Sequence, residues 1–261
     1  MKAGVLYHIL LLTVVLSLLS TIVLSTEYKV VNNEVNAEDI LKHIENGDDV
    51  NLTNCHIVGE LNLSKIELKT VPMTDLRIIT SNISIKDSKF ENKLDFSNMQ
   101  FNNTVSFKRT FFKNSADFSY MNFNNSADFS YTNFNNSATF QDTGFFNFAN
   151  FHDANFNNEA NFIDAIFWNN ADFRNVSFNG SVYFNYASIS NSLFSMTKFT
   201  NDANFTVTDF LKSVDFRDAN FNKNANFADA NFNKDANFSG AIINGFANFD
   251  GVIINDASNF I

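Results

Sequence analysis

Phenylalanine recurs along this chain in steps that alternate between five and six residues, and this register limits the fold more than any other feature. From Phe90 to Phe260 the register has 32 positions, of which 29 are Phe and three are Ile. One residue is dropped after Phe184, so that Ile189 and Phe194 follow at steps of five. A helix cannot hold this pattern, because its apolar stripe would rotate around the helix axis. A fixed repeat of this kind indicates a solenoid.

A second pattern precedes the register residues. A small residue stands two positions earlier and a polar one lies between, as in Ala116-Asp117-Phe118. Small-polar-large has the period of an extended strand, with the first and third side chains on one face. The remaining two or three residues of each unit are turn formers such as Asn and Ser. Before Phe90 the register is expected to continue through aliphatic residues and one weak position: Leu52, Ile57, Leu63, Leu68, Thr74, Ile79 and Ile85.

The Ala-Asp/Asn-Phe-x-x pattern resembles the pentapeptide-repeat family. The resemblance implies an all-β fold over residues 51–261, a right-handed quadrilateral parallel β-helix. This chain departs from the regular family coil of four five-residue faces, because every second unit has a sixth residue. Each coil would then consist of two five-residue and two six-residue units, with an enlarged corner on two sides. Phe118, Phe140 and Phe162 would stack above one another in the core.

Residues 26–50 are expected to form a leader and a capping helix. Residues 27–35 are polar and predict a short linker. Asn36 is a suitable N-cap, acidic residues follow in the first turn, and Gly47 is a natural end for the helix. Because the first coil of a solenoid needs shielding from water, we expect this short helix to cover it.

The N-terminal residues 1–25 predict a signal peptide or a membrane anchor. Lys2 is followed by an uncharged stretch that reaches Thr26. A basic start before an apolar run is typical of a secretion signal. The apolar run over residues 5–24 is also long enough to cross a bilayer. The expected location is therefore secreted, or anchored to the outer face of the cell membrane by residues 5–24.

Several function classes find no support in the sequence. A net charge of −10 disfavours nucleic acid as a ligand, because phosphates attract an excess of Lys and Arg. The single cysteine, Cys55, excludes an intrachain disulfide, and with His56 alone it does not make a metal site. His152 is expected to be a solvated surface residue, and acids such as Asp117 recur only because the repeat recurs. We expect no catalytic residues, no cofactor and no metal, and predict that the chain is not an enzyme.

Irregularities in the repeat are better candidates for contact sites. Phe146 and Trp168 lie one coil apart and each directly follows a register residue, so both are expected to point outward and to be available to a sugar or a protein. The alternative is that they only cover a loop or each other. The last coil would expose strand edges and an apolar end, which predicts a homodimer through the C-terminal coil. The residues of that end are Ile243, Phe249, Ile254 and Phe260.

These observations favour a non-enzymatic extracellular or surface solenoid with a structural or protein-interaction role and an unidentified protein or glycan partner. Two alternatives remain open. Some acidic pentapeptide-repeat rods bind gyrase as substitutes for DNA, and the resemblance allows the same role here. A polysaccharide-binding β-helix is the other alternative. Fold resemblance alone cannot choose among these roles.

Overall fold

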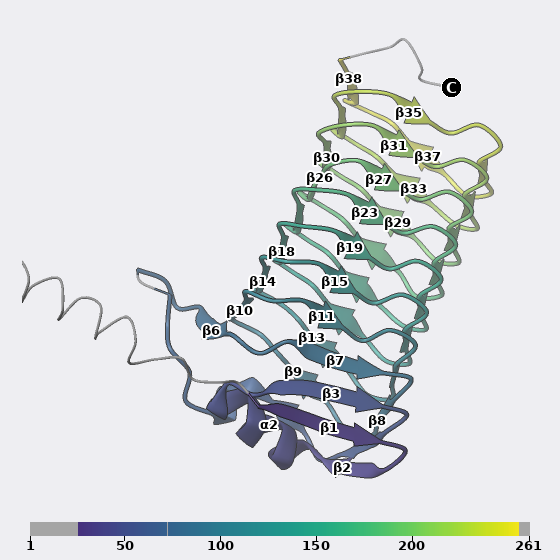
Figure 1. The fold of residues 1–261 in the computed structure, drawn as a ribbon. Helices are drawn as coiled ribbons and strands as arrows, with labels where there is room; N and C mark the ends of the chain where they lie inside the picture. The colour runs from purple at the N-terminus through teal and green to yellow at the C-terminus, as the bar shows by residue number, and fades with distance from the viewer. Residues whose placement is uncertain (1–25, 72, 256–261) are drawn as a thin grey trace, which may run out of the picture.

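The computed structural model describes residues 26–71 and 73–255, which wind into a parallel β-solenoid with four faces (Figure 1). Each regular coil contributes one strand to each face, in the order sheet A, B, C and D. Equivalent residues of successive coils pair in register, as Ala116 and Ala138 do. The four-sided parallel β-helix predicted from the sequence is confirmed. The expected signal or anchor over residues 5–24, Pro72 and Phe260 lie outside the described residues.

Within the described residues, sheets A and B each contain ten strands. Sheet A comprises β1 (Glu27–Val31), β3 (Asp49–Thr53), β7 (Ile83–Lys86), β11 (Val105–Ser106), β15 (Ala127–Asp128), β19 (Ala149–Asn150), β23 (Ala171–Asp172), β27 (Ser192–Leu193), β31 (Val214–Asp215) and β35 (Ala236–Asn237). Sheet B comprises β2 (Glu34–Asn36), β4 (His56–Val58), β8 (Lys89–Phe90), β12 (Phe111–Phe112), β16 (Asn133–Phe134), β20 (Asn155–Phe156), β24 (Ser177–Phe178), β28 (Lys198–Phe199), β32 (Asn220–Phe221) and β36 (Ile242–Ile243).

Sheets C and D each contain nine strands in the part of the chain that the structure describes. Sheet C comprises β5 (Leu61–Asn62), β9 (Leu94–Asp95), β13 (Ala116–Asp117), β17 (Ala138–Thr139), β21 (Ala160–Asn161), β25 (Val182–Tyr183), β29 (Ala203–Asn204), β33 (Ala225–Asn226) and β37 (Ala247–Asn248). Sheet D comprises β6 (Arg77–Ile79), β10 (Met99–Phe101), β14 (Asn122–Phe123), β18 (Gly144–Phe145), β22 (Ile166–Phe167), β26 (Ser188–Ile189), β30 (Asp209–Phe210), β34 (Asn231–Phe232) and β38 (Ile253–Ile254).

The core consists of columns of stacked phenylalanine rings with small residues between them. Phe140 stacks on Phe118 and on Phe162, with ring centroids 4.9 Å apart in both pairs and interplanar angles of 7° and 3°. Rings of neighbouring columns meet edge to face, as Phe140 and Phe151 do at 5.3 Å and 89°. Both geometries suit the ring quadrupole, and each buried ring adds roughly 2–3 kcal/mol of hydrophobic stabilisation. The Phe residues of the predicted register are therefore the side chains that form the core.

The corners between sheets are of two kinds, which explains the alternation of five and six. In the five-residue steps the chain makes a tight turn. The carbonyl oxygen of the core Phe accepts a hydrogen bond from the backbone N–H three residues later, as Phe107 O does from Thr110 N at 3.1 Å. The third residue of each such turn has a left-handed backbone with φ between 52° and 61° where it is not Gly. In the turns from sheet A to B and from sheet C to D these residues are Asn32, Asn54, Asp87, Asn98, Arg109, Tyr120, Tyr131, Asp142, Asp153, Asp164, Asn175, Tyr186, Met196, Val207, Asp218 and Asp229. The six-residue steps form the wider corners from B to C and from D to A.

The N-terminal end of the solenoid begins earlier than the sequence predicted. Residues 27–35, expected to be a linker, instead form β1 and most of β2, which pair in parallel with β3 and β4. Tyr28 and Val30 alternate with charged and exposed neighbours, so β1 buries one face against the core. The helix α2 (Ala37–Asn46) then takes the place of sheets C and D (Figure 1). Its predicted cap at Asn36 and its end at Gly47 are confirmed, with Asn36 accepting from Glu38 N at 3.0 Å.

The first complete coil carries an insertion that the predicted register did not recognise. Val50 of β3 pairs with Ile83 of β7, so this coil is half as long again as the regular coils that follow it. After the short 3-10 helix η1 (Leu63–Lys65), the chain leaves the coil and returns at β6, and the excursion projects from the side of the rod (Figure 1). Leu68 is only half-buried and Thr74 is exposed, so neither is the core position that was expected. A corner tolerates such an excursion because surface loops lengthen at small entropic cost.

Candidate binding groove

The most irregular place in the Phe-rich coils is the corner where one residue is missing. A regular corner from sheet D to sheet A has three residues between the core Phe and the next small residue, whereas only Ser190 and Asn191 separate Ile189 from Ser192. Asn191 adopts a left-handed backbone with φ of 40°, and its Nδ2 donates to Asn170 Oδ1 at 3.2 Å. We call this shortened corner, Ser190 and Asn191, the notch.

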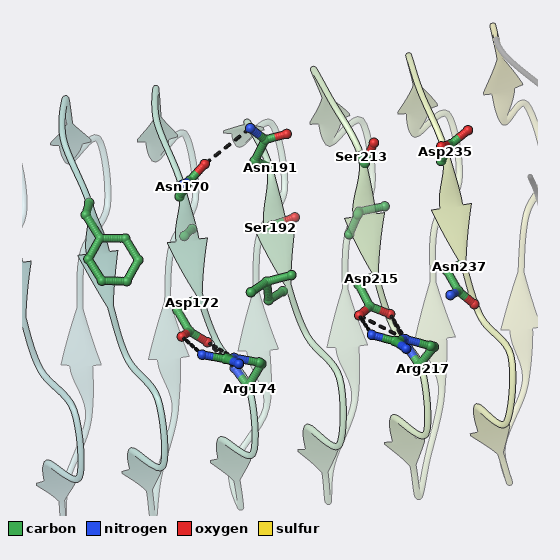
Figure 2. A pocket seen from close by; sticks show the side chains of 14 residues that line it. Asn170, Asp172, Arg174, Asn191, Ser192, Ser213, Asp215, Arg217, Asp235 and Asn237 are labelled. Carbon is green, nitrogen blue, oxygen red and sulfur yellow. Dashed lines mark hydrogen bonds and ion pairs between the residues drawn. The ribbon is translucent and has the colours of Figure 1, made fainter.

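A groove of about 590 Å³ lies at this notch and follows sheet A along the axis from β19 to β35. Four interstrand spacings of about 4.8 Å give it a length of roughly 19 Å. Figure 2 shows its two polar rows, with Asn170, Asn191, Ser213 and Asp235 along the corner and Asp172, Asp215 and Asn237 along the strands. The other lining residues are Phe148, Ala171, Arg174, Ser192, Leu193, Val214 and Arg217.

The groove has an apolar side chain between two ion pairs. Leu193 pairs in register with Asp172 on one side and Asp215 on the other, so it occupies a row that is otherwise polar in the neighbouring strands. It is 37% exposed. The Asp residues of this row accept a hydrogen bond from the backbone N–H two residues later. Leu193 cannot accept such a bond, and its side chain instead gives the groove an exposed apolar surface.

The two ion pairs are bidentate and fixed by the backbone. Arg174 donates from Nε to Asp172 Oδ1 at 2.9 Å and from Nη2 to Oδ2 at 2.6 Å (Figure 2). Arg217 binds Asp215 in the same way, at 3.0 Å and 2.8 Å. Each Asp also accepts from the backbone N–H of its Arg, both at 3.0 Å. Such paired geometry orients both guanidinium groups more firmly than a single contact does.

Electrostatics keep these pairs charged. Burial alone raises the pKa of Asp215, but the hydrogen bonds and charge of Arg217 together outweigh it, so the pKa lies below its usual value. The hydrogen bonds to Asp172 raise the pKa of Arg174, and those to Asp215 raise the pKa of Arg217. Neither Nη1 group bonds to an acceptor in residues 26–71 and 73–255, and both guanidinium groups are partly exposed. The groove therefore offers two oriented guanidinium groups with free donors.

The aromatic residues predicted to point outward do so. Phe146 and Trp168 follow β18 and β22 on sheet D and are 41% and 66% exposed. Ile166 is exposed beside them in the outward row, where Gly144 precedes it by one coil. The Phe146 ring packs over Gly144. A Cβ atom on residue 144 would lie only 2.8 Å from Cε2 of Phe146. We call Phe146, Ile166 and Trp168 the aromatic surface.

The C-terminal residues singled out from the sequence lie at the other end of the rod from α2 (Figure 1). Ile243 is half-buried, whereas Phe249 and Ile254 are exposed, together with Ile242, Phe246 and Ile253. Phe260 lies outside the described residues. The described part of this end is therefore apolar.

Other sequence candidates have structural roles. His56 Nε2 contacts Glu91 Oε1 at 2.9 Å, and Cys55 is buried. Glu91 also binds Lys89 and Lys113, and the hydrogen bonds of Lys113, Lys89 and His56 lower its pKa to about 2. Across the described chain, no group of three His, Cys, Asp or Glu residues is arranged to hold a metal ion.

The remaining candidates are repeat acids and one histidine. Asp117 and Asp128 accept from Ser119 N and Ser130 N, at 2.9 Å and 3.0 Å. They cap corners, as their place in the repeat suggested. His152 Nε2 lies 2.9 Å from Asp153 Oδ2 at the surface.

The coil geometry defines the class of protein: a four-sided parallel β-solenoid built from five- and six-residue units. The sequence profile described as pentapeptide repeats (9 copies) matches residues 145–188, 184–231 and 219–261. Residues 145–261 therefore match the pentapeptide-repeat family, and the same four sheets continue on the N-terminal side of the matched residues.

Among solved structures, a trypsin-treated form of QnrB1, described as a plasmid-mediated fluoroquinolone resistance protein, matches 88% of this chain and 92% of its own. Sequence identity is 17% and the TM-score is 0.27. No curated protein sequence matches the chain.

Sequence reasoning noticed the dropped residue but attached no function to it. The signal that would have located the groove was the combination of that shortened step with Leu193 in a polar row and with Arg two residues after Asp172 and Asp215. No single one of these features is unusual, and only the stacking of coils brings them together.

Proposed function

We propose that the chain is a non-enzymatic scaffold that binds a protein partner outside the cytoplasm through its aromatic surface. The observation that carries the proposal is the exposure of Phe146, Ile166 and Trp168 side by side on a sheet whose outward rows are otherwise largely polar. Water orders unfavourably around such side chains, so covering them with a partner is favourable.

The support for a protein partner is the kind of side chain and the rigidity of its base. Tryptophan and other aromatic side chains dominate the energetics of protein interfaces when a ring of weaker contacts excludes water around them. Here the neighbours along sheet D are polar, such as Asn122 before Gly144 and Ser188 after Ile166. Strands β18 and β22, which carry these side chains, pack on stacked core rings. The surface is therefore rigid before binding, and little conformational entropy is lost when a partner binds.

The proposed location, secreted or anchored to the outer face of the membrane, rests on the apolar segment over residues 5–24. Among residues 26–71 and 73–255, none of the helices is long and apolar enough to span a bilayer. Fractionation of cells, with sequencing of the mature N-terminus, tests this location. Recovery of the unprocessed chain in the cytoplasm would contradict it.

A DNA-mimic role has less support. Two of the acids that face outward on sheet A, Asp172 and Asp215, are neutralised by Arg174 and Arg217, and Asp87 is paired with Arg109. The outward rows of sheets B and C are mostly asparagine and other uncharged residues, whereas a mimic of DNA needs regular rows of free negative charge.

The aromatic surface is testable with a photo-crosslinking residue at position 168 and, as a matched control, at Gln100 in the same outward face of sheet D. In intact cells we expect one protein adduct from position 168 and none from position 100. Ile166→Asp in the crosslinking chain should abolish the adduct without changing the melting temperature. Equal adducts from both positions would contradict a specific surface.

We also propose that two copies associate through the C-terminal coil. The described apolar residues at this end, among them Phe249 and Ile254, support a two-fold contact that would cover β35 to β38. Sedimentation of the full chain at micromolar concentration should give a dimer, and Ile254→Lys should give a folded monomer. A wild-type chain that sediments as a monomer would refute the contact.

A further inference from the structure

We propose that the groove on sheet A binds an uncharged linear oligosaccharide, laid along the axis of the rod across the notch at Asn191. The proposal goes beyond the protein-binding function, because it uses a different surface and depends on none of Phe146, Ile166 and Trp168. It is carried by the shape, the charge and the hydrogen-bonding groups of the groove.

Shape selects an elongated ligand. The groove crosses four successive strands of sheet A, β23, β27, β31 and β35, and reaches Phe148 before β19, instead of forming a round pocket. Its polar groups repeat at the strand spacing of about 4.8 Å, because each coil presents its side chains one rung above the last. A polymer with a regular repeat can therefore use the same kind of contact on several rungs, whereas a compact metabolite would use only one or two.

Charge selects an uncharged ligand. The lining carries three carboxylates and two guanidinium groups, and two of the carboxylates are held in bidentate pairs with Arg174 and Arg217. A polyanion would meet these carboxylates and a chain whose net charge is −10. A polycation would find only Asp235 outside an ion pair, and would have to displace Arg174 or Arg217 to reach Asp172 or Asp215.

The polar groups suit hydroxyls. Each Arg has an Nη1 group outside its ion pair, and the exposed amides of Asn170 and Asn191 line the opposite row. A hydroxyl both donates and accepts, so it can pair with an amide on one wall and a guanidinium on the other. Leu193 lies between the two ion pairs, where it can contact the apolar C–H face of a pyranose ring.

An extended peptide fits less well. A peptide that adds to a sheet needs a free strand edge for its own N–H and C=O groups. Strands β23, β27 and β31 lie inside sheet A with neighbours on both sides, and their backbone is occupied, as in the bonds Ala171 N to Asn191 O at 3.3 Å and Ser192 N to Ser213 O at 3.2 Å. A peptide would therefore bury its backbone polar groups against side chains alone.

The test is isothermal titration calorimetry of the full chain, kept in solution with a polyoxyethylene detergent that contains no sugar. The probes are cellohexaose and chitohexaose as neutral chains, polygalacturonate as an anionic chain, and an extended Ser/Thr-rich hexapeptide. We expect at least one neutral chain to bind, with no binding of polygalacturonate or peptide. Leu193→Asn and Arg217→Gln should each weaken the neutral chain about tenfold or more, which corresponds to about 1.4 kcal/mol.

Tyr186→Asn is the matched control. Tyr186 is exposed at a corner from sheet C to sheet D and does not line the groove, and Asn suits its left-handed backbone. Its affinity should equal that of the parent chain. Failure of both neutral chains to bind, preference for polygalacturonate or for the peptide, or an equal loss in the Tyr186 variant would each overturn the proposal. Because the aromatic surface is untouched in all three variants, loss of sugar binding would leave its crosslinked adduct intact.

Discussion

The Phe-rich coils from β8 to β34 and the aliphatic coils before them reach the same architecture with different side chains. In the first region identical rings stack nearly parallel, as Phe129 and Phe151 do at 5.0 Å and 5°. In the second region residues such as Leu52, Ile57 and Leu63 occupy the inward positions and are equally buried. Inward size and backbone period therefore specify the solenoid, and aromatic stacking is one way to fill it.

The two regions differ in how much irregularity they contain. The aliphatic end includes α2 and an excursion that makes one coil half as long again as a regular one, whereas the Phe-rich coils depart from the regular length by a single residue. Each stacked ring needs a partner at the same height and corner in the next coil, so a large change in coil length would disrupt several columns at once. Aliphatic side chains interlock less specifically and accommodate a neighbour of different shape.

The largest effect is expected in the middle of a ring column. Phe140→Ala should lower the free energy of unfolding by about 3–5 kcal/mol, because it removes one ring from a stack and leaves a cavity. Ile57→Ala, in the aliphatic region, should cost about 2–5 kcal/mol and less than Phe140→Ala. Phe140→Leu should cost under about 2 kcal/mol. Chemical denaturation measures all three, and a larger loss for Ile57→Ala would break the comparison.

Asp117→Ala is the outward control for these core variants. Asp117 is only half-buried and caps Ser119, so its loss should cost about 1 kcal/mol or less. If this variant proved less stable than Phe140→Ala, the assignment of the inner and outer faces would be wrong.

The capped helix at the aliphatic end should contribute a smaller amount. Asn36→Ala removes the acceptor for Glu38 N and should cost about 1 kcal/mol. Asn36→Ser should restore most of the loss, because a hydroxyl also caps. Hydrogen exchange of α2 should accelerate in the Ala variant while the amides of β20 and β24 stay unchanged. Equal acceleration in both regions would mean that the helix caps the whole rod cooperatively.

Val207 is a strained corner within the Phe-rich coils. It has a β-branched side chain at φ 56°, where the equivalent corners use Asp, Asn, Tyr and others. Val207→Asn should raise the free energy of unfolding by about 0.5–1 kcal/mol, because Asn tolerates the left-handed region. The reciprocal change, Asp229→Val at φ 55°, should lower it by a similar amount. Opposite signs in thermal melts would refute this view of the corner.

The excursion in the aliphatic coil should be dispensable. Deleting residues 66–76 joins Lys65 to Arg77 and leaves a step of five from Leu63 to Ile79, which is the step of a regular corner between sheets C and D. We expect a folded chain at least as stable as the parent, because shortening a surface loop lowers the entropic cost of closing it. A molten product would show that the excursion supports the core.

The smallest effect concerns acid stability at the junction of the two regions. Lys113, Lys89 and His56 lower the pKa of Glu91 from its usual 4.5 to about 2 in the folded chain. Because the folded pKa is depressed, this contribution to stability is present above pH 4.5 and is lost as the pH falls towards 2. Glu91→Gln should flatten the stability profile in this window. An unchanged profile would show that Glu91 is not held by its neighbours in solution.

The sequence was sufficient for the regular part of the molecule. The Phe register, the small residue two positions earlier and the Asn36 cap each arise from local patterns that repeat or lie within a few residues of one another. β1 was missed because it has a single pairing partner, β3, and its alternation of Tyr28 and Val30 with charged residues is short. The excursion was missed because Leu68 happened to keep the expected spacing although the chain had left the coil.

The candidate sites divide in the same way. That Phe146 and Trp168 point outward followed from the residue count, because each lies next to an inward ring. The groove did not, because it depends on three coils placing Asp172, Leu193 and Asp215 in one row. Contacts between successive coils are set by the exact length of each corner, which sequence spacing alone describes only where it is regular.

The central claim is that regular rungs provide the fold while interruptions provide the binding sites. The most direct measurement inserts one Asn between Asn191 and Ser192, which restores a six-residue step at the notch. The account predicts a chain that melts at or above the parent temperature and binds the neutral oligosaccharide about tenfold or more weakly in calorimetry. Unchanged affinity, or an unfolded chain where a regular corner should fit, would contradict it.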